Sequence, residues 1–96
     1  MIQTVYILTD PTGAETAYIG RTRRSPEVRL KAHMLDTGWG QPKNRKCQWI
    51  KMLKARGLRP VMTILDVLPE PDAIQFELDA IAMCKAIRGE NCVNGK

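Results

Sequence analysis

The last helix that the sequence predicts carries one carboxylate on its apolar side. At about 100° per residue, the apolar arc of this helix is formed by Ala73, Ile74, Ala80, Ile81 and Cys84. Glu77 falls near the middle of that arc. Burying a carboxylate is costly unless it is paired or binds a cation. Glu77 is therefore either ion-paired with an arginine from another element, or a metal ligand or acid–base group.

A guanidinium and an imidazole share one face of the first predicted helix. Arg29 and His33, which is the only histidine, are spaced i, i+4 and so lie on the same side, with Asp36 close by. Taken alone, this spacing is typical of a solvated helix surface. A single histidine also excludes a metal site built from several histidines.

Both tyrosines of the chain fall in its first predicted hairpin. If the turn centres near Thr12, Tyr6 and Tyr18 lie about opposite each other on one face, because the side chains of a strand alternate. We expect their rings in the core, with the hydroxyls reaching a polar partner. Asn94, near the end of the sequence, is by default an exposed tail residue.

Positive charge is concentrated in the middle of the chain. Positions 21 to 59 hold twelve of the fifteen Lys and Arg residues and two acids, a net charge of +10, against −5 for the remaining positions. This separation is typical of a polyanion-binding protein, although a solvated basic face is also consistent with it. Trp39 and Trp49 flank the basic loop; we expect Trp49 in the core and Trp39 exposed, where it could stack on an unpaired base.

Turn and capping residues divide the chain into six elements. The predicted elements are strands over 3–8, 17–20 and 61–68, and helices over about 26–37, 45–56 and 72–88. Ser25 and Pro26 form a helix start, and Gly57 and Gly89 end the second and third helices. The order β-β-α-α-β-α predicts an α+β domain in which helices cover a small sheet.

Length and composition exclude several classes of protein. Ninety-six residues are enough for one domain, residues 1–96, and not for a second folded unit. The sequence has no apolar run near the roughly 18 residues of a membrane span, no signal peptide and no phosphate-binding GxxxxGK[ST] or GxGxxG string. Cys47, Cys84 and Cys92 are odd in number and widely spaced, so we expect reduced thiols and a cytoplasmic location.

Together these residues resemble the GIY-YIG nuclease family. The motifs that carry the resemblance are Thr4-Val5-Tyr6, Tyr18-Ile19-Gly20, Arg29 with His33, Glu77 within Phe76-Glu77-Leu78, and Val93-Asn94. They cover residues 3 to 94 in the family's order, and the resemblance implies a three-stranded antiparallel sheet flanked by helices. Thr4 stands where the family has its first glycine. Arg21 stands where some relatives have a catalytic lysine, and because arginine does not readily lose a proton it can only bind phosphate there.

The resemblance implies a catalytic set of Tyr6, Tyr18, Arg29, His33, Glu77 and Asn94. Glu77 would hold one Mg²⁺ or Mn²⁺, with waters and the substrate phosphate completing the site. Arg29 and Arg21 would bind the scissile phosphate, and Asn94 would order the site by hydrogen bonding. Tyr18 or Tyr6 would orient the attacking water and accept its proton.

The sequence does not decide which group is the general base. A tyrosine has an ordinary pKa near 10, so for Tyr18 or Tyr6 to act at neutral pH a nearby arginine and the metal must lower it. His33 is the alternative, because it could take the proton directly or relay it.

We therefore expect a metal-dependent DNA endonuclease that hydrolyses phosphodiester bonds and nicks DNA with low sequence specificity. DNA would contact Arg21, Arg23, Arg24, Lys43, Arg45 and Lys46. A homodimer or a targeting partner protein would supply any further specificity, because the site residues span most of the chain. The alternatives are a non-catalytic nucleic-acid-binding module that retains the fold, and an unrelated basic protein that binds another protein.

Overall fold

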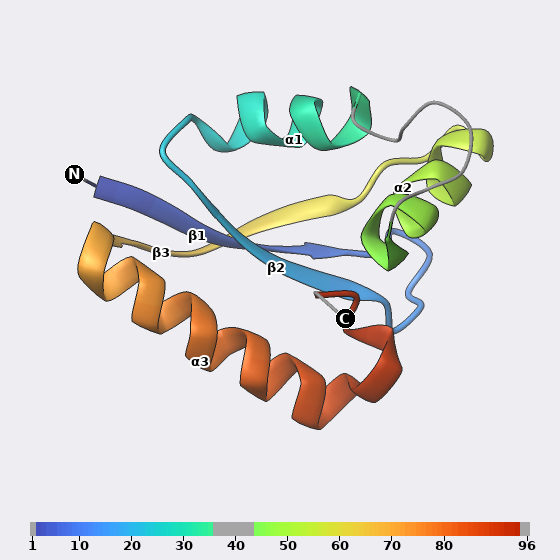
Figure 1. The fold of residues 1–96 in the computed structure, drawn as a ribbon. Coiled ribbons are helices and arrows are strands. Elements are labelled where there is room, and N and C mark those ends of the chain that lie inside the picture. The colour runs from blue at the N-terminus through green and yellow to red at the C-terminus, as the bar shows by residue number, and fades with distance from the viewer. Residues whose placement is uncertain (1, 36–43, 95–96) are drawn as a thin grey trace.

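The computed structural model describes residues 2–35 and 44–94, which form one layered α+β unit (Figure 1). Its elements are β1 (Ile2–Thr9), β2 (Ala17–Thr22), α1 (Pro26–Leu35), α2 (Arg45–Ala55), β3 (Val61–Pro69), α3 (Glu70–Arg88) and the 3₁₀ turn η1 (Gly89–Asn91). The predicted order β-β-α-α-β-α is confirmed. The expected end of the first helix near Thr37 lies outside the described residues, as do Asp36 and Trp39.

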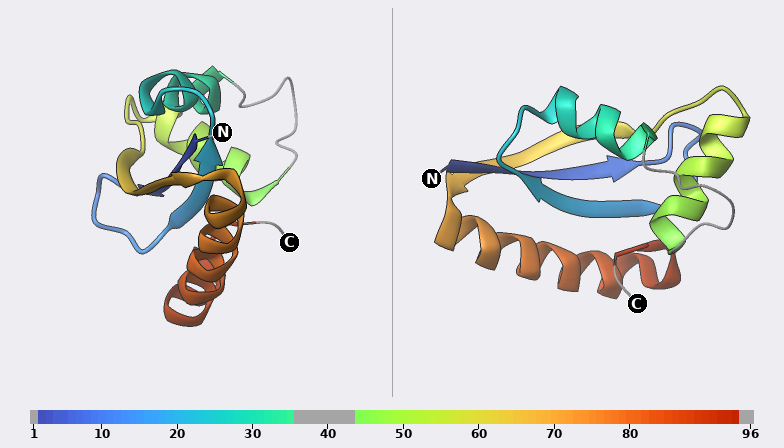
Figure 2. Two further views of the ribbon diagram at one scale, coloured as in Figure 1. Left: turned by 90° about the vertical axis from the view of Figure 1, so that its left-hand side faces the viewer. Right: turned by 45° about the horizontal axis from the view of Figure 1, so that its top comes forward.

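The three strands form one antiparallel sheet in the order β2-β1-β3. Helix α1 covers one face, α3 runs along the opposite face, and α2 lies at one end (Figures 1 and 2). β1 is the central strand, and β2 and β3 are the two edges. A side chain on α3 can therefore reach the far face only around an edge.

The hairpin register places Tyr6 opposite Gly20 and Tyr18 opposite Leu8. The prediction that the two tyrosines face each other is wrong by two residues, because the pairing centres on Gly13 and not on Thr12. Asp10 Oδ1 accepts hydrogen bonds from the Thr12 backbone N–H at 2.8 Å and its hydroxyl at 2.6 Å, and Gly13 adopts a φ of +87°. Because strand side chains alternate, the two tyrosines still share one face.

Two apolar clusters lie on the two faces of the sheet. The cluster facing α3 contains Val5, Ala17, Ile19, Ala73, Cys84 and Cys92, and the other contains Tyr6, Leu8, Trp49, Ile50, Leu53 and Val93. Trp49 is in the core as predicted, and its indole N–H donates to Asp10 Oδ2 at 3.0 Å. This bond fixes α2 against the hairpin loop, since it satisfies a buried donor and a carboxylate together.

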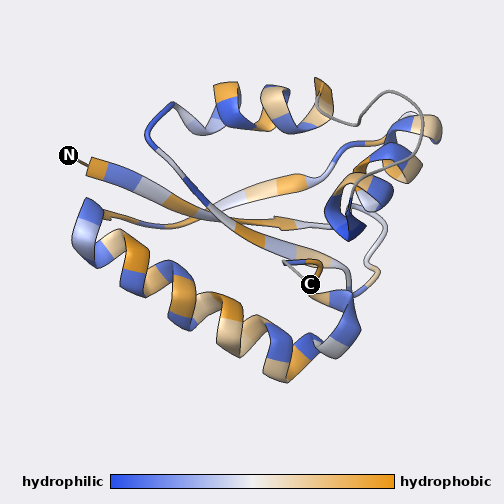
Figure 3. Ribbon diagram, viewed as in Figure 1, coloured by the Kyte–Doolittle hydropathy of each residue, from blue (hydrophilic) through white to orange (hydrophobic). Residues whose placement is uncertain are grey.

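The apolar arc of α3 is narrower than predicted. Ala73 and Cys84 are buried, whereas Ile74 remains 38% exposed. The edge strand β3 is also open, with Ile64 and Val67 about half exposed. Apolar and polar residues are interspersed along α3 (Figure 3). Neither α3 nor any other helix in the described part of the chain is both long and apolar enough to cross a bilayer.

Candidate functional site

A buried hydrogen bond joins the central strand to α1. The Tyr6 hydroxyl and His33 Nε2 lie 2.6 Å apart, and the two side chains are 0% and 2% exposed. The expectation of a solvated surface for His33 is therefore wrong. α1 turns this face onto the sheet, and Tyr6 gives the imidazole a polar partner there.

Tyr18 and Lys46 complete the surroundings of the imidazole. The Tyr18 ring lies edge-on to His33, with centroids 5.5 Å apart at 75°. Lys46 Nζ, from the first turn of α2, sits 5.2 Å from the Tyr18 ring centroid. Two strands and two helices thus converge on one aromatic cluster, with a cation over its outer ring.

Gly20 is required by the position of Tyr6. A Cβ atom added at Gly20 would overlap the Tyr6 hydroxyl and its ring carbon Cζ, and would lie 3.0 Å from Tyr18 Cε2. Any larger residue would displace the phenol from His33. The Tyr-Ile-Gly string therefore has a packing reason that is independent of any family.

Burial raises the pKa of both phenols. For Tyr6 the pKa reaches about 12, mainly by loss of solvent, with the Arg29 guanidinium beside the hydroxyl opposing the rise and the Glu77 carboxylate adding to it. The pKa of Tyr18 is also raised by burial, and the same two charges act on it. A tyrosine base would need a lowered pKa, and in this state desolvation outweighs Arg29 and raises the pKa of both phenols. Arg29 and Glu77 nevertheless lie within electrostatic range of both tyrosines.

Glu77 is ion-paired in this structure. Arg21 Nε donates to Glu77 Oε1 at 3.0 Å, and the carboxylate side chain is only 19% exposed. Arg21 Nη1 also donates to Gln3 Oε1 at 2.7 Å, and Gln3 Nε2 donates to Glu70 Oε1 at 2.7 Å. Of the two interpretations of Glu77, the ion pair is confirmed, and the metal ligand stays a prediction.

Gln3 was not anticipated from the sequence. It is 2% exposed and links the start of β1 to Arg21 and α3. The available signal was a polar residue at a strand position whose neighbours on the same face, Val5 and Ile7, are apolar.

Glu77 offers a divalent cation one carboxylate, which suits a site that waters and a substrate phosphate would complete. No group of three or more His, Cys, Asp or Glu side chains in the described residues could hold a metal ion. Mg²⁺ is commonly held by one or two carboxylates together with waters and substrate phosphates, and Glu77 supplies one such carboxylate. A bound phosphate would complete the site, and without one the single carboxylate would hold the ion weakly.

Asn94 is buried, which corrects the expectation of an exposed tail. Its Oδ1 accepts from the Ile19 backbone N–H at 2.7 Å, and its Nδ2 donates to the Ile19 carbonyl at 2.6 Å. Val93 N–H also donates to the Ala17 carbonyl at 2.9 Å. Asn94 thus holds the β2 backbone between Tyr18 and Gly20, and it is a positioning residue.

The predicted nucleic-acid contacts have different surroundings. Arg23 Nη2 donates to Glu70 Oε1 at 2.8 Å, and Arg24 and Arg45 have exposed side chains. Lys46 lies over Tyr18, as described above, and Lys43 lies outside the described residues. Lys46 therefore belongs to the aromatic cluster, whereas Arg23 is engaged with Glu70 at the start of α3.

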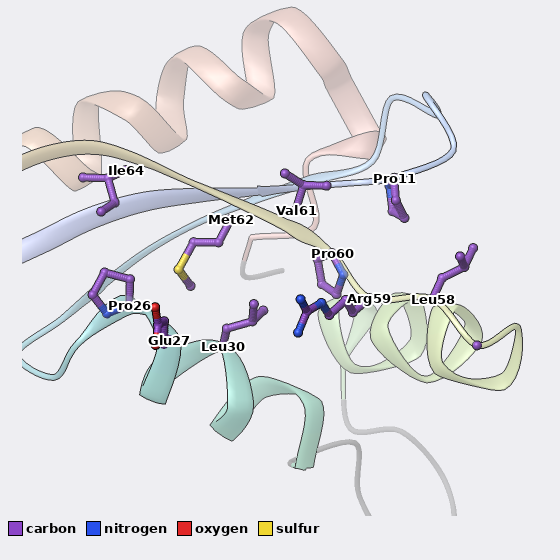
Figure 4. Close-up of a pocket in the computed structure, with 11 residues that line it drawn as sticks. Pro11, Pro26, Glu27, Leu30, Leu58, Arg59, Pro60, Val61, Met62 and Ile64 are labelled. Atoms are coloured by element: carbon purple, nitrogen blue, oxygen red, sulfur yellow. The ribbon is translucent and has the colours of Figure 1, made fainter.

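A groove of about 570 Å³ lies elsewhere, between α1 and β3 (Figure 4). Its walls include Pro26, Leu30, Pro60, Met62 and Ile64, with Glu27 and Arg59 at its rim. None of the predicted catalytic residues lines it. We place the candidate site at the Tyr6–His33 pair and the β2 edge, because the Tyr6–His33 hydrogen bond lies there and Arg29 and Glu77 act electrostatically on both phenols.

Comparisons with known proteins add no assignment. No family model matches the chain, and neither a curated protein nor a solved structure matches it.

Proposed function

We propose that this chain is a metal-dependent DNA endonuclease of the GIY-YIG type, which hydrolyses phosphodiester bonds and nicks DNA with low sequence specificity. The observation that carries the proposal is the buried Tyr6–His33 hydrogen bond of 2.6 Å, with Arg29 acting on the same phenol. Burying an imidazole and a phenol costs stability that apolar residues would not cost. In this proposal the protein retains these polar groups in spite of the cost because they move a proton and act beside the group that binds the phosphate.

The proton path follows from the pKa of Tyr6. At about 12, the phenol stays protonated at neutral pH, and its side chain has no exposed surface, so Tyr6 is neither the base nor in contact with the attacking water; it holds His33 through their hydrogen bond. Imidazole ordinarily titrates near neutral pH, which makes His33 the proposed acceptor of the proton. Tyr18, which lies against the same imidazole, orients the water in this proposal.

Charge on the phosphate is the second requirement. Arg29 supplies a guanidinium beside Tyr6, which suits a phosphoryl oxygen because its planar N–H groups bind two oxygens at once. Glu77 would hold the Mg²⁺ or Mn²⁺, which supplies charge stabilisation of the pentacovalent transition state when bound. Asn94 acts indirectly, by fixing the β2 backbone that carries Tyr18.

DNA is the proposed partner, and its backbone would lie across the basic surface next to the site. The exposed Arg24 and Arg45 and the Lys46 ammonium support this path. A homodimer or a targeting protein remains part of the proposal as the source of any specificity. We also propose a cytoplasmic location, supported by three buried cysteines that form no disulfide in the described chain.

Plasmid nicking tests the proposal directly. Purified protein is incubated with supercoiled DNA and Mg²⁺ or Mn²⁺, with and without chelator, beside Glu77→Gln and Arg29→Ala. We expect wild type to nick only with metal, Arg29→Ala to lose on the order of 10²–10³ in rate, and Glu77→Gln to be inactive. Asp79→Asn is the matched control, since this exposed acid lies two residues further along α3 and bonds Gln75.

The outcomes separate the enzyme from its main alternative. Protein that binds DNA but never nicks it with either metal is a nucleic-acid-binding module that retains the fold. One observation favours that alternative, namely that Glu77 already has a counter-ion in Arg21. Nicking by Glu77→Gln at the wild-type rate would remove Glu77 as the metal ligand while leaving the nuclease in place.

A further inference from the structure

Arg21, on the edge strand β2, is held by two hydrogen-bond acceptors. Its guanidinium donates on one side to Glu77 Oε1 at 3.0 Å and on the other to Gln3 Oε1 at 2.7 Å. Gln3 is itself buried and tied to Glu70, so the arginine is held by a network that spans β1, β2 and α3. An arginine that served only to attract DNA would not need two acceptors of its own.

Arg21 binds the same carboxylate, that of Glu77, which the proposed cation would use. A divalent ion at Glu77 and the Arg21 guanidinium would be like charges in contact with one carboxylate, at low solvent exposure where screening is weak. The two cations therefore compete for Glu77. In the free protein Arg21 has an advantage over a dissolved metal ion in binding Glu77. It is part of the same chain, and its hydrogen bond to Gln3 already orders its side chain.

We propose that Arg21 is an internal counter-ion that holds Glu77 closed to metal until DNA arrives. This inference rests on the proposed nuclease function and assigns its regulation. A phosphodiester accepts the guanidinium in a geometry as good as that of a carboxylate. Arg21 moves from Glu77 to the phosphate, and the released carboxylate takes the divalent ion.

The exchange links the two ligands. DNA would raise metal affinity in two ways, because its phosphate would complete the coordination of the ion and because it would remove Arg21 from Glu77. Metal would raise DNA affinity by the same factor, since coupling between two binding equilibria is reciprocal. Gln3 keeps its bond to Arg21 Nη1 during the exchange, so the guanidinium pivots and does not leave the site. Free protein consequently carries little metal and no assembled catalytic centre.

Metal binding by the free protein is the test. Mn²⁺ binding is measured by calorimetry or by the electron paramagnetic resonance of unbound Mn²⁺, without DNA, for wild type, Arg21→Gln and Arg21→Lys. We expect Arg21→Gln to tighten Mn²⁺ binding at least tenfold and Arg21→Lys to stay near wild type. Arg23→Gln is the matched control, because it removes the same charge two residues away from an arginine paired with Glu70.

A second measurement adds DNA. In the presence of a short duplex and at a temperature where no cleavage is seen, wild-type affinity for Mn²⁺ should rise, and Arg21→Gln should gain far less. Equal or weaker Mn²⁺ binding by folded Arg21→Gln overturns the proposal. If that variant does not fold, a Mn²⁺ affinity of wild type that is unchanged by the duplex overturns it.

The results also separate this inference from the proposed function. A protein that never nicks plasmid but shows the tightening on Arg21→Gln keeps the counter-ion exchange and loses the nuclease. A protein that nicks, with metal affinity indifferent to Arg21, loses the exchange alone.

Discussion

Replacing Gly20 by alanine tests the packing on which the whole site depends. The added Cβ would overlap the hydroxyl and Cζ of Tyr6, whose ring is fully buried and cannot swing into solvent. Relief requires the phenol to shift away from His33 or the β2 backbone to separate from β1. Either movement breaks or stretches the 2.6 Å Tyr6–His33 bond.

The magnitude follows from comparable changes in packed interiors. Forcing one extra methyl into a full core costs about 1–3 kcal/mol. In a domain of this size each kcal/mol lowers the unfolding midpoint by roughly 4–8 °C. We therefore expect Gly20→Ala to unfold about 4–24 °C below wild type, and the proposed nicking activity to fall even where the protein remains folded.

A double-mutant cycle assigns the cost to the right contact. Thermal and urea unfolding are measured for Gly20→Ala, Tyr6→Leu and the pair, because leucine removes the ring that the new Cβ meets. The pair should be less destabilised than the sum of the two, by about 0.5–3 kcal/mol. Gly13→Ala is the control: its Cβ meets nothing within 4 Å and its cost is backbone strain at φ +87°, so it should add without coupling to Tyr6→Leu.

An additive Gly20 cycle, or an unfolding midpoint of Gly20→Ala within a degree or two of wild type, would refute this packing. Tyr6 would then not lie over Gly20, and the reason given for the glycine would fail with it.

Two further predictions concern stability. Asn94→Ala leaves the backbone N–H and C=O of Ile19 without their partner and should cost about 1–3 kcal/mol in urea unfolding, with faster hydrogen exchange at the Ile19 amide; unchanged exchange would show that Asn94 does not hold β2. The pKa of Tyr6 rises from 10.0 to about 12 on folding, so its contribution is fully present below pH 10 and is lost as pH rises towards 12. Tyr6→Phe should therefore flatten the alkaline fall in unfolding free energy by up to about 2–3 kcal/mol, and an identical fall in the variant would contradict the burial argument.

The sequence predicted the elements well because their ends carry strong local signals. Ser25 accepts the Val28 N–H at 3.3 Å, and Gly57 and Gly89 adopt the positive φ values expected after a helix. The hairpin register was wrong because it depends on how Asp10 closes the loop with Thr12. That choice involves hydrogen bonds which composition does not reveal.

The site was predicted as a set of residues and not as a set of contacts. Burial of His33 could not be deduced from its helix, since its partner Tyr6 lies 27 positions away on another element. The sequence did not show which arginine would pair with Glu77, and the fold shows that it is Arg21. The tyrosine pKa values are raised because the effect of burial outweighs the opposing effect of Arg29. The balance of these two effects depends on three-dimensional positions, which the sequence does not give.

The Asn94–Ile19 contact has a consequence for how the protein is made. It joins groups 75 positions apart, so it forms only after synthesis has carried residue 94 clear of the ribosome. Until then β2, with Tyr18 and Gly20, lacks its outer clamp while the basic middle of the chain is already exposed. A growing chain therefore exposes its basic middle before the β2 edge has gained its last hydrogen bonds.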